Sequence, residues 1–235
     1  MHVRSIKTET FKEGQALVSF VKKYIPRVRE NTIIAVTSKI VALSENRTVK
    51  ANSKRKARLI RDESEVALRS KHVWLTLKDG AIMANAGIDE SNANGKLILL
   101  PKDSFKTAAW LRKQLKRLYG VKRLGVLITD SRVAPLRKGV TGVALGYAGF
   151  KGKHHYRGTR DLFGRKFKFS EVNIADSLAT SAVLIMGEGR ERTPLAIIEG
   201  APFETANIVR RNELVIDPQN DLYRPVIYFP KKRRR

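Results

Sequence analysis

The chain has 235 residues and a mass of 26.5 kDa, and a hydrophobic content of 42% is typical of a globular protein with a large core. It has no cysteine, so it has no disulfides, thiolate ligands or cysteine nucleophiles. Its four His residues are scattered along the chain, so a bound metal would need oxygen ligands, as Mg²⁺ or Mn²⁺ does. Its 47 Lys and Arg residues exceed 22 Asp and Glu residues by 25, which favours anionic ligands. No signal-peptide pattern or long apolar run occurs, so we expect a cytoplasmic protein with no membrane partner.

The first half of the chain predicts two helices and several strands. Apolar residues recur at helical spacing over 12–25, and the apolar run of 31–39 indicates a buried strand with a polar end. Residues 53–70 indicate a basic amphipathic helix, with Ala67 and Leu68 among its inner positions. Two strands, 72–77 and 81–85, then flank a turn.

Residues 103–120 contain the clearest helix pattern. Asp103 or Ser104 provides the N-cap, and Gly120 ends the helix. The apolar positions that we expect to face the core are Phe105, Ala108, Leu111, Leu115 and Leu118.

The second half predicts further strands around one more helix. A buried strand over 123–131 ends in Asp130 and Ser131, and a glycine-rich alternating segment occupies 140–150. A basic connection then leads into a strand and a helix that ends at Gly187. The remaining predicted strands are 96–101, 194–198 and 225–229, after a short first strand near the N-terminus.

This irregular alternation predicts the α+β class, with mixed sheets and packed helices. No clean linker interrupts it, so we expect one domain over residues 1–228, built from two interleaved subdomains. A basic tail, 229–235, follows. The basic residues are densest in this tail and on the predicted helix between Lys54 and Arg61.

Acidic residues are scarce, and three of them follow apolar segments beside glycine or hydroxyl residues: Asp89, Asp130 and Glu188. Brought together, they would bind a divalent metal through oxygen, and nearby Lys and Arg would suit phosphates. A purely structural explanation is at least as common: Asp89 and Asn92 stabilise an Asx turn, and Asp130 caps a turn or helix.

Common nucleotide and hydrolase motifs are missing. The chain has no GxxxxGK[ST] loop, no GxGxxG after a strand, no GxSxG and no HExxH. GEGRER, residues 187–192, has glycines and arginines able to hold phosphate, but this pattern is weakly specific.

Several segments, in order, resemble the coenzyme F420-0:L-glutamate ligase family, a gamma-glutamyl ligase family, over residues 2–200. They are TSKIVALSENR, RLIRDESE, ANAGIDESN, LITDS, RGTRDLFGR and ADSLATSAVLIMGE. The resemblance implies a mixed α+β fold and a homodimer with extensive intertwining. It also implies an enzyme that uses GTP, with ATP not excluded, and Mg²⁺ or Mn²⁺ to join L-glutamate to an acceptor carboxylate through an amide bond.

The same resemblance implies roles for particular residues. Asp89 and Asp130 correspond to ligands of one metal, and Ser131 and Glu188 to ligands of the second. Asn92, Ser38 and Lys39 fall on nucleotide contacts, and Asp89, Asp130 and Lys39 would act in catalysis. The segment that wraps the nucleotide corresponds to 186–193 and includes Met186, Gly187, Gly189, Arg190 and Thr193. Gly87 would let the backbone come close to the ligand.

The chain departs from the family pattern after Asp130. Where the family reads close to DTFGRPWRxG, residues 130–139 are DSRVAPLRKG, so only Pro135, Arg137 and Gly139 remain of its later part. Leu43 replaces a second Lys, and the family's N-terminal GIP element is absent. These changes leave two acceptors open, and the PLRKGVTG variant places a folate-like acceptor slightly ahead of the deazaflavin precursor of coenzyme F420.

An alternative of another class is a basic nucleic-acid-binding protein derived from the ligase fold. It would contact phosphates through the basic helix and the tail, and its affinity would fall steeply with salt. Aromatic residues make up only 7% of the chain, which disfavours a surface built for base stacking. We therefore expect nucleic acid not to be a partner.

Overall fold

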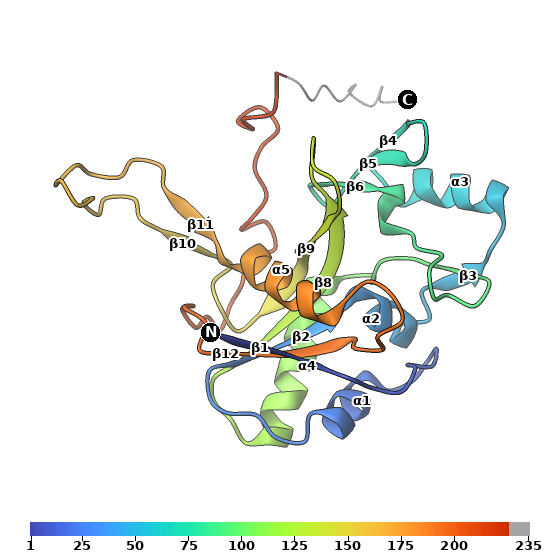
Figure 1. Cartoon of the computed structure of the whole chain (residues 1–235), viewed down its shortest axis with the longest axis horizontal. Coiled ribbons are helices and arrows are strands. Elements are labelled where there is room, and N and C mark those ends of the chain that lie inside the picture. The colour runs from blue at the N-terminus through green and yellow to red at the C-terminus, as the bar shows by residue number, and fades with distance from the viewer. Residues whose placement is uncertain (226–235) are drawn as a thin grey trace. The chain divides into compact units, whose positions relative to one another are not determined.

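A computed structural model of the chain describes residues 1–225, which form two compact units (Figure 1). The first unit consists of residues 1–47 and 101–213. The second consists of 48–100 and the described chain from Leu214 onward. Helices and mixed sheets are both present, so the predicted α+β class is confirmed.

A five-stranded sheet in the order β1-β12-β2-β8-β9 is the centre of the first unit. Neighbouring β2 and β8 run parallel, and every other pair in the sheet is antiparallel. Both faces of the middle strands are buried, which explains their nearly continuous apolar runs. The strands are β1 (His2–Ile6), β2 (Thr32–Thr37), β8 (Leu124–Val133), β9 (Val140–Ala148) and β12 (Leu195–Glu199).

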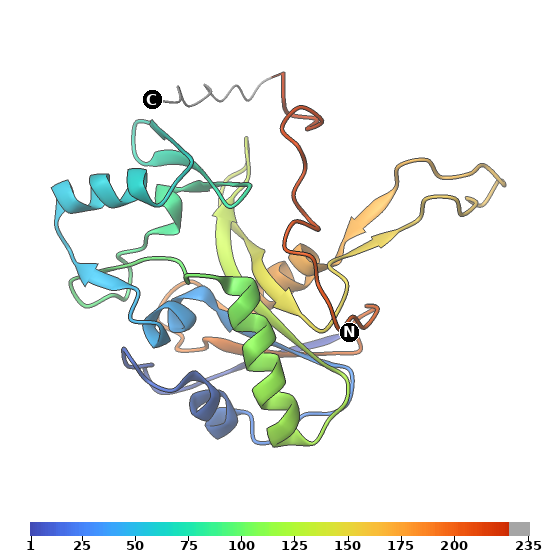
Figure 2. The same cartoon turned by 180° about the vertical axis from the view of Figure 1, so that it is seen from behind.

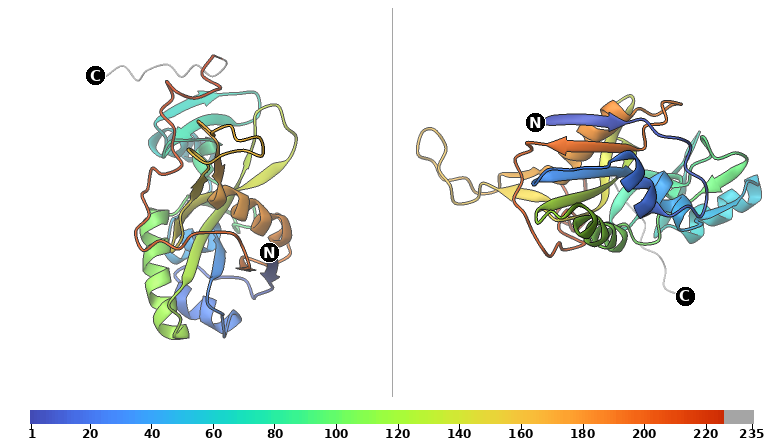
Figure 3. Two further views of the ribbon diagram at one scale, coloured as in Figure 1. Left: turned by 90° about the vertical axis from the view of Figure 1, so that its left-hand side faces the viewer. Right: turned by 90° about the horizontal axis from the view of Figure 1, so that it is seen from below.

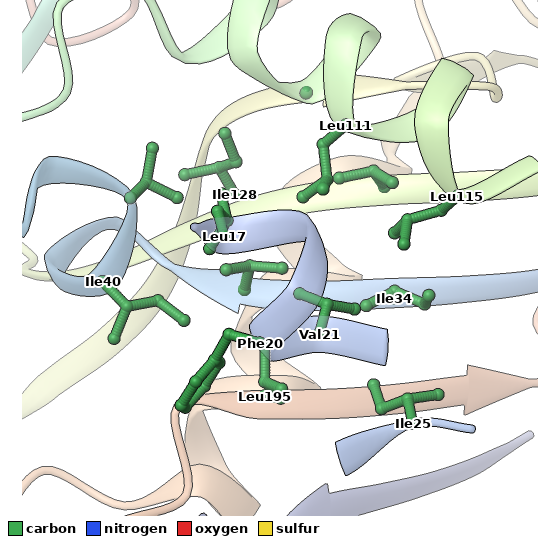
Figure 4. Close-up of a cluster of buried hydrophobic side chains, with 14 of the residues drawn as sticks. Leu17, Phe20, Val21, Ile25, Ile34, Ile40, Leu111, Leu115, Ile128 and Leu195 are labelled. Carbon is green, nitrogen blue, oxygen red and sulfur yellow. The ribbon is translucent and has the colours of Figure 1, made fainter. Parts of the chain in front are cut away.

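Helices cover both faces of this sheet. α1 (Leu17–Tyr24), α2 (Ser38–Ser44) and α4 (Ser104–Tyr119) belong to one face, and α5 (Ile174–Met186) lies on the other (Figures 2 and 3). A large apolar cluster fills the space between the sheet and the helices α1, α2 and α4 (Figure 4). It includes Leu17, Phe20, Val21, Ile34, Leu111, Leu115, Ile128 and Leu195.

Helix α4 agrees with its predicted ends. The Asp103 carboxylate accepts a hydrogen bond from Lys106 N–H (3.0 Å), and Gly120 ends the helix with a φ of +67°. Leu118, which we expected to face the core, is 50% exposed instead. It lies in the last turn, beyond Leu115, the last fully buried position of the helix.

The glycines of β9 let two helices approach the strand. A Cβ on Gly142 would lie 2.3 Å from the Ala179 carbonyl oxygen of α5, and one on Gly146 would lie 2.5 Å from the Ser104 backbone of α4. A register shift between β8 and β9 at Ile128 and Thr129 separates these two glycines. The glycine-rich pattern of 140–150 therefore reflects close packing with helices.

The basic connection forms a hairpin of the first unit. β10 (Lys153–His155) pairs antiparallel with β11 (Glu171–Asn173), and the hairpin extends away from the five-stranded sheet (Figure 1). The Asp161 carboxylate near the tip accepts hydrogen bonds from the N–H groups of Phe163 and Arg165 (2.9 and 2.8 Å). The tip therefore has a defined backbone.

The second unit contains a three-stranded sheet, a two-stranded sheet and one helix. Ile60, Ile88, Leu97 and Leu99 form its buried cluster. Its elements are β3 (Thr48–Lys50), α3 (Ser53–Asp62), β4 (Val66–Arg69), β5 (Trp74–Lys78), β6 (Ala81–Ala84), the 3₁₀ turn Asn85–Gly87 and β7 (Lys96–Ile98).

Several predicted boundaries were wrong. The basic helix ends at Asp62 because Ala67 and Leu68 belong to β4, which pairs with β5. The first predicted helix begins only at Leu17, since a turn with Gly14 at a φ of +73° precedes it. The strand over 31–39 stops at Thr37, where α2 begins. Of the predicted strand 225–229 only Pro225, in a turn, is described; the rest and the tail lie outside the described residues.

Candidate active site

The sheet of the first unit brings two of the predicted segments together at the carboxyl ends of neighbouring strands. β2 and β8 are parallel neighbours, and Thr37 is registered with Thr129. Ser38 begins α2 directly after Thr37, and Asp130 directly follows Thr129. The TSK segment and Asp130 therefore lie beside each other, at the edge where parallel strands present their carboxyl ends and ligands commonly bind.

Asp130 and Ser131 lie within β8, whereas we predicted that they end the strand. β8 continues to Val133, and the two residues pair with Val143 and Gly142 of β9. The Ser131 N–H donates a hydrogen bond to Asp130 Oδ1 (2.9 Å). A paired strand holds the carboxylate more rigidly than an exit loop would.

The segment after α5 reaches the side chain of Ser131. Gly187 ends α5 with a φ of +77°, and the Glu188 side chain is solvent-exposed. The Ser131 hydroxyl donates a hydrogen bond to Glu188 Oε2 (3.2 Å). The structure therefore brings Glu188 to Ser131, which lies 57 positions earlier in the chain and directly after Asp130.

The loop 187–193 is tied to the end of β2. The Thr193 hydroxyl donates to the Met186 carbonyl, which closes the loop on the end of α5. Thr37 N–H donates to the carbonyl of Pro194 (3.0 Å), so the loop ends beside the TSK segment. Gly189 and Arg190 lie in the exposed middle of this loop.

Glu191 has a role in this loop that the sequence did not indicate. Its carboxylate accepts a hydrogen bond from Gly189 N–H (2.8 Å). A Cβ on Gly187 would lie 2.6 Å from the Glu191 carboxyl carbon. The glycines of GEGRER therefore accommodate a carboxylate of the same loop, a constraint that spacing in the sequence does not show.

Asp176 is a second side chain that the sequence did not single out. Its carboxylate accepts hydrogen bonds from Ala144 N–H (2.9 Å) and from the Asn173 side-chain amide (2.8 Å). The Arg132 guanidinium lies 3.4 Å from it. Asp176 thereby fixes the start of α5 to β8 and β9. The only signal in the sequence was its place in the ADSLATSAVLIMGE block.

Asp89 and Asn92 belong to the second unit. The Asp89 carboxylate accepts hydrogen bonds from the Ser91 N–H (2.7 Å) and hydroxyl (2.8 Å). Asp89 therefore forms the Asx turn that we considered as its purely structural role. Glu90 forms an ion pair with Lys56 of α3 (3.0 Å). Asn92 has a φ of +53°, as Asn in a turn often does.

A left-handed backbone run precedes Asp89. Asn85, Ala86 and Gly87 have φ values of +53°, +55° and +71°. Trp74 N–H donates to the Asn85 side chain, and Ala86 N–H donates to the Thr76 hydroxyl, both at 2.9 Å. A Cβ on Gly87 would lie 2.5 Å from Leu100. Gly87 therefore accommodates Leu100, and the expectation that it also lets a ligand come close to the backbone stays a prediction.

A family of known proteins matches most of the chain. The family model described as F420-0:Gamma-glutamyl ligase matches residues 5–200. The chain belongs to the F420-0:gamma-glutamyl ligase family. The resemblance seen in the sequence is thereby confirmed.

Curated members of the F420-0:gamma-glutamyl ligase family are similar to the chain over much of its length. The coenzyme F420:L-glutamate ligase of Methanococcus maripaludis strain C6 is 35% identical over 231 residues, which is 90% of this chain and 92% of the relative. The enzyme of the same name from Methanocaldococcus jannaschii is 40% identical over 168 residues, or 71% and 67%. That from Archaeoglobus fulgidus is 31% identical over 208 residues, or 80% and 83%.

The oxygen donors of this family member suit a hard divalent cation in kind. Asp130, Ser131 and Glu188 offer two carboxylates and a hydroxyl, the chemistry that Mg²⁺ and Mn²⁺ prefer. Within residues 1–225, no group of three or more Asp, Glu, His or Cys side chains is arranged to hold a metal ion. The two-metal assignment therefore stays a prediction, as do the roles of Asp89 and Asn92.

Proposed function

We propose that this protein is a nucleotide-dependent ligase that joins the amine of L-glutamate to a carboxylate of the deazaflavin coenzyme F420 precursor. The match to the family over residues 5–200 carries the proposal. The names of the relatives support it, because each is a coenzyme F420:L-glutamate ligase. The same names favour the deazaflavin over the folate-like acceptor that the sequence placed slightly ahead.

The reaction needs an activated carboxylate, since a carboxylate is a poor acylating group. In the proposed sequence an acceptor oxygen attacks the terminal phosphorus of GTP, the bond to the β-phosphate oxygen breaks, and GDP leaves. The glutamate amine then attacks the acyl carbon. Inorganic phosphate leaves, and the amine proton passes to phosphate or solvent.

Residues at the carboxyl ends of β2 and β8 have complementary proposed roles. Lys39 attracts the phosphates and offsets the repulsion between two approaching anions, while Ser38 and the loop 186–193 hold the nucleotide. Asp130, Ser131 and Glu188 offer the oxygen atoms that would hold Mg²⁺ or Mn²⁺. Such an ion supplies charge neutralisation on the phosphates when bound.

We also propose that the protein acts in the cytoplasm as a homodimer. None of the helices in the described chain is long and apolar enough to cross a membrane.

The β10–β11 hairpin supports self-association, because Leu162, Phe163 and Phe169 are almost fully exposed on it. The nucleic-acid alternative has no observation in its favour beyond the positive charge.

A ligation assay with the purified protein tests the proposal. Each reaction contains L-glutamate, Mg²⁺ or Mn²⁺, GTP or ATP, and the deazaflavin precursor or a folate, and mass spectrometry detects the glutamate adduct. We expect an adduct with the deazaflavin and with GTP, and one nucleotide hydrolysed per amide bond. The absence of both adduct and nucleotide hydrolysis in every combination would refute the proposed ligase activity.

A further inference from the structure

The turn between β8 and β9 carries a leucine in an unfavourable place. Arg137 N–H donates to the Ala134 carbonyl (3.2 Å), so residues 134–137 form a turn, and Leu136 has a φ of +57°. Glycine and asparagine suit a positive φ, whereas the Cβ of leucine crowds the backbone. Leu136 is also fully exposed. Strain and exposed apolar surface in one residue point to a contact outside the fold.

Two valines extend this apolar surface. Val133 and Val140 are directly registered partners at the ends of β8 and β9. Both side chains are about half exposed. Side chains of registered partners lie side by side on one face of a hairpin, so the pair presents a continuous apolar surface next to the turn.

The charge of the turn is entirely positive. Residues 132–139 contain Arg132, Arg137 and Lys138 and no acidic residue. Arg132 is paired with Asp176, whereas Arg137 and Lys138 are exposed. An apolar surface with a cationic rim suits a ligand that is apolar and carries negative charge.

The distance from Asp130 restricts the size of the ligand. Three residue steps along the extended strand lead from Asp130 to Val133, which corresponds to about 10 Å. A molecule that reaches from the turn to Asp130 must therefore be extended, with its ring and its carboxylate at opposite ends. The deazaflavin precursor and folates both have this form.

We propose that the β8–β9 turn, residues 133–140, binds the planar heteroaromatic ring of the acceptor while the reacting carboxylate lies near Asp130 and Glu188. This inference rests on the proposed function. Leu136 contacts the ring face, Val133 and Val140 complete the apolar surface, and Arg137 and Lys138 attract the charge of the acceptor.

Two substitutions at Leu136 test the proposal in the full-length protein. Leu136→Ala and Leu136→Gly should each raise the KM for the acceptor about tenfold, since they remove the apolar contact. The kcat at saturating acceptor and the KM for GTP should stay within about twofold of the wild type. Leu136→Gly should also raise the Tm, because glycine relieves the strained φ. Leu118→Ala, at another exposed leucine, is the matched control and should change neither KM.

The outcomes separate this inference from the function on which it rests. The acceptor used is the one that the wild type turns over, deazaflavin or folate. If the wild type is active and both Leu136 variants keep its acceptor KM, the ring subsite is refuted and the ligase function stands. If the wild type forms no adduct, binding of a free deazaflavin ring is followed by fluorescence. Weaker binding to Leu136→Gly than to Leu118→Ala would support the subsite, and equal binding would refute it.

Discussion

The Thr129 hydroxyl is fully buried and has no hydrogen-bond partner within residues 1–225. Leaving such a group unpaired costs about 1–3 kcal/mol. Thr129 directly precedes Asp130 on β8, so the cost falls beside the candidate active site. A sequence does not show such a cost, because threonine is an ordinary strand residue.

Replacing Thr129 with Val should stabilise the protein. Valine has nearly the same shape and carries no unpaired hydroxyl, so the free energy of unfolding should rise by about 1 kcal/mol. Urea unfolding followed by circular dichroism measures the change, and Thr141→Val, at an exposed position of β9, is the control. A Thr129→Val variant less stable than the wild type would mean that the hydroxyl has a partner in solution.

The residue scale also shows which site residues a sequence can reveal. Ser131 and Glu188 were predictable in kind, because each is polar and follows an apolar segment, and the structure joins them by a hydrogen bond. Asp176 and Glu191 were not, since their roles depend on hydrogen-bond partners that only the folded chain defines. Hydrophobic periodicity contains no information about such partners.

At the scale of elements, α4 is attached to the end of α1 by Tyr119. Its hydroxyl donates a hydrogen bond to the Ile25 carbonyl (2.5 Å), and the Lys22 ammonium lies 4.4 Å from its ring centroid. Burial raises the pKa of Tyr119 to about 12 from its usual value of 10. The neutral phenol is therefore the form that the folded protein favours.

This raised pKa predicts a loss of stability at alkaline pH. The unfolded chain releases the phenol proton near pH 10 and the folded chain near pH 12, so the contribution is complete below pH 10 and is lost as the pH rises through 12. Tyr119→Phe should be less stable than the wild type at pH 8 by about 1 kcal/mol, since it lacks the hydrogen bond.

Between pH 10 and pH 12 the stability of Tyr119→Phe should fall less steeply than that of the wild type. Urea unfolding of both proteins at pH 8, 10, 11 and 12 measures this. The comparison removes the effects of alkaline pH that both proteins share. Parallel stability curves for the two proteins would show that Tyr119 titrates alike in the folded and unfolded states.

Helices and strands with strong local sequence signals were predictable, whereas those that depend on pairing with a distant strand were less so. Both caps of α4 follow from Asp103 and Gly120. Residues 63–70 continued a helical pattern, yet 66–69 pair with β5 as a strand. Tertiary pairing overrode the local preference there, because β5 offers backbone partners that an isolated helix turn lacks.

At the scale of the whole molecule, the β10–β11 hairpin predicts self-association. Phe163 is 95% exposed at the hairpin tip, in a backbone that Asp161 fixes. A rigid tip with exposed apolar side chains is suited to docking on a second copy. We expect the wild type to be a dimer in light scattering after size exclusion.

Phe163→Asp should shift the protein toward the monomer, because a charge would be buried at the interface. Leu222→Asp, at another exposed apolar residue, should leave the dimer intact and controls for the added charge. A dimer of unchanged stability in Phe163→Asp would place the interface elsewhere. A monomeric wild type would refute the dimer itself.

Turnover of an Asp130→Asn variant in the ligation assay tests the central claim, that the active site of a ligase lies at the carboxyl ends of β2 and β8. The substitution keeps the side-chain shape and removes the charge. The account predicts a fall in glutamate-adduct formation of about 10³-fold, with Tm and far-ultraviolet circular dichroism unchanged. Asp62→Asn, an exposed residue of α3, should keep full activity. Near-normal adduct formation by Asp130→Asn would contradict the account.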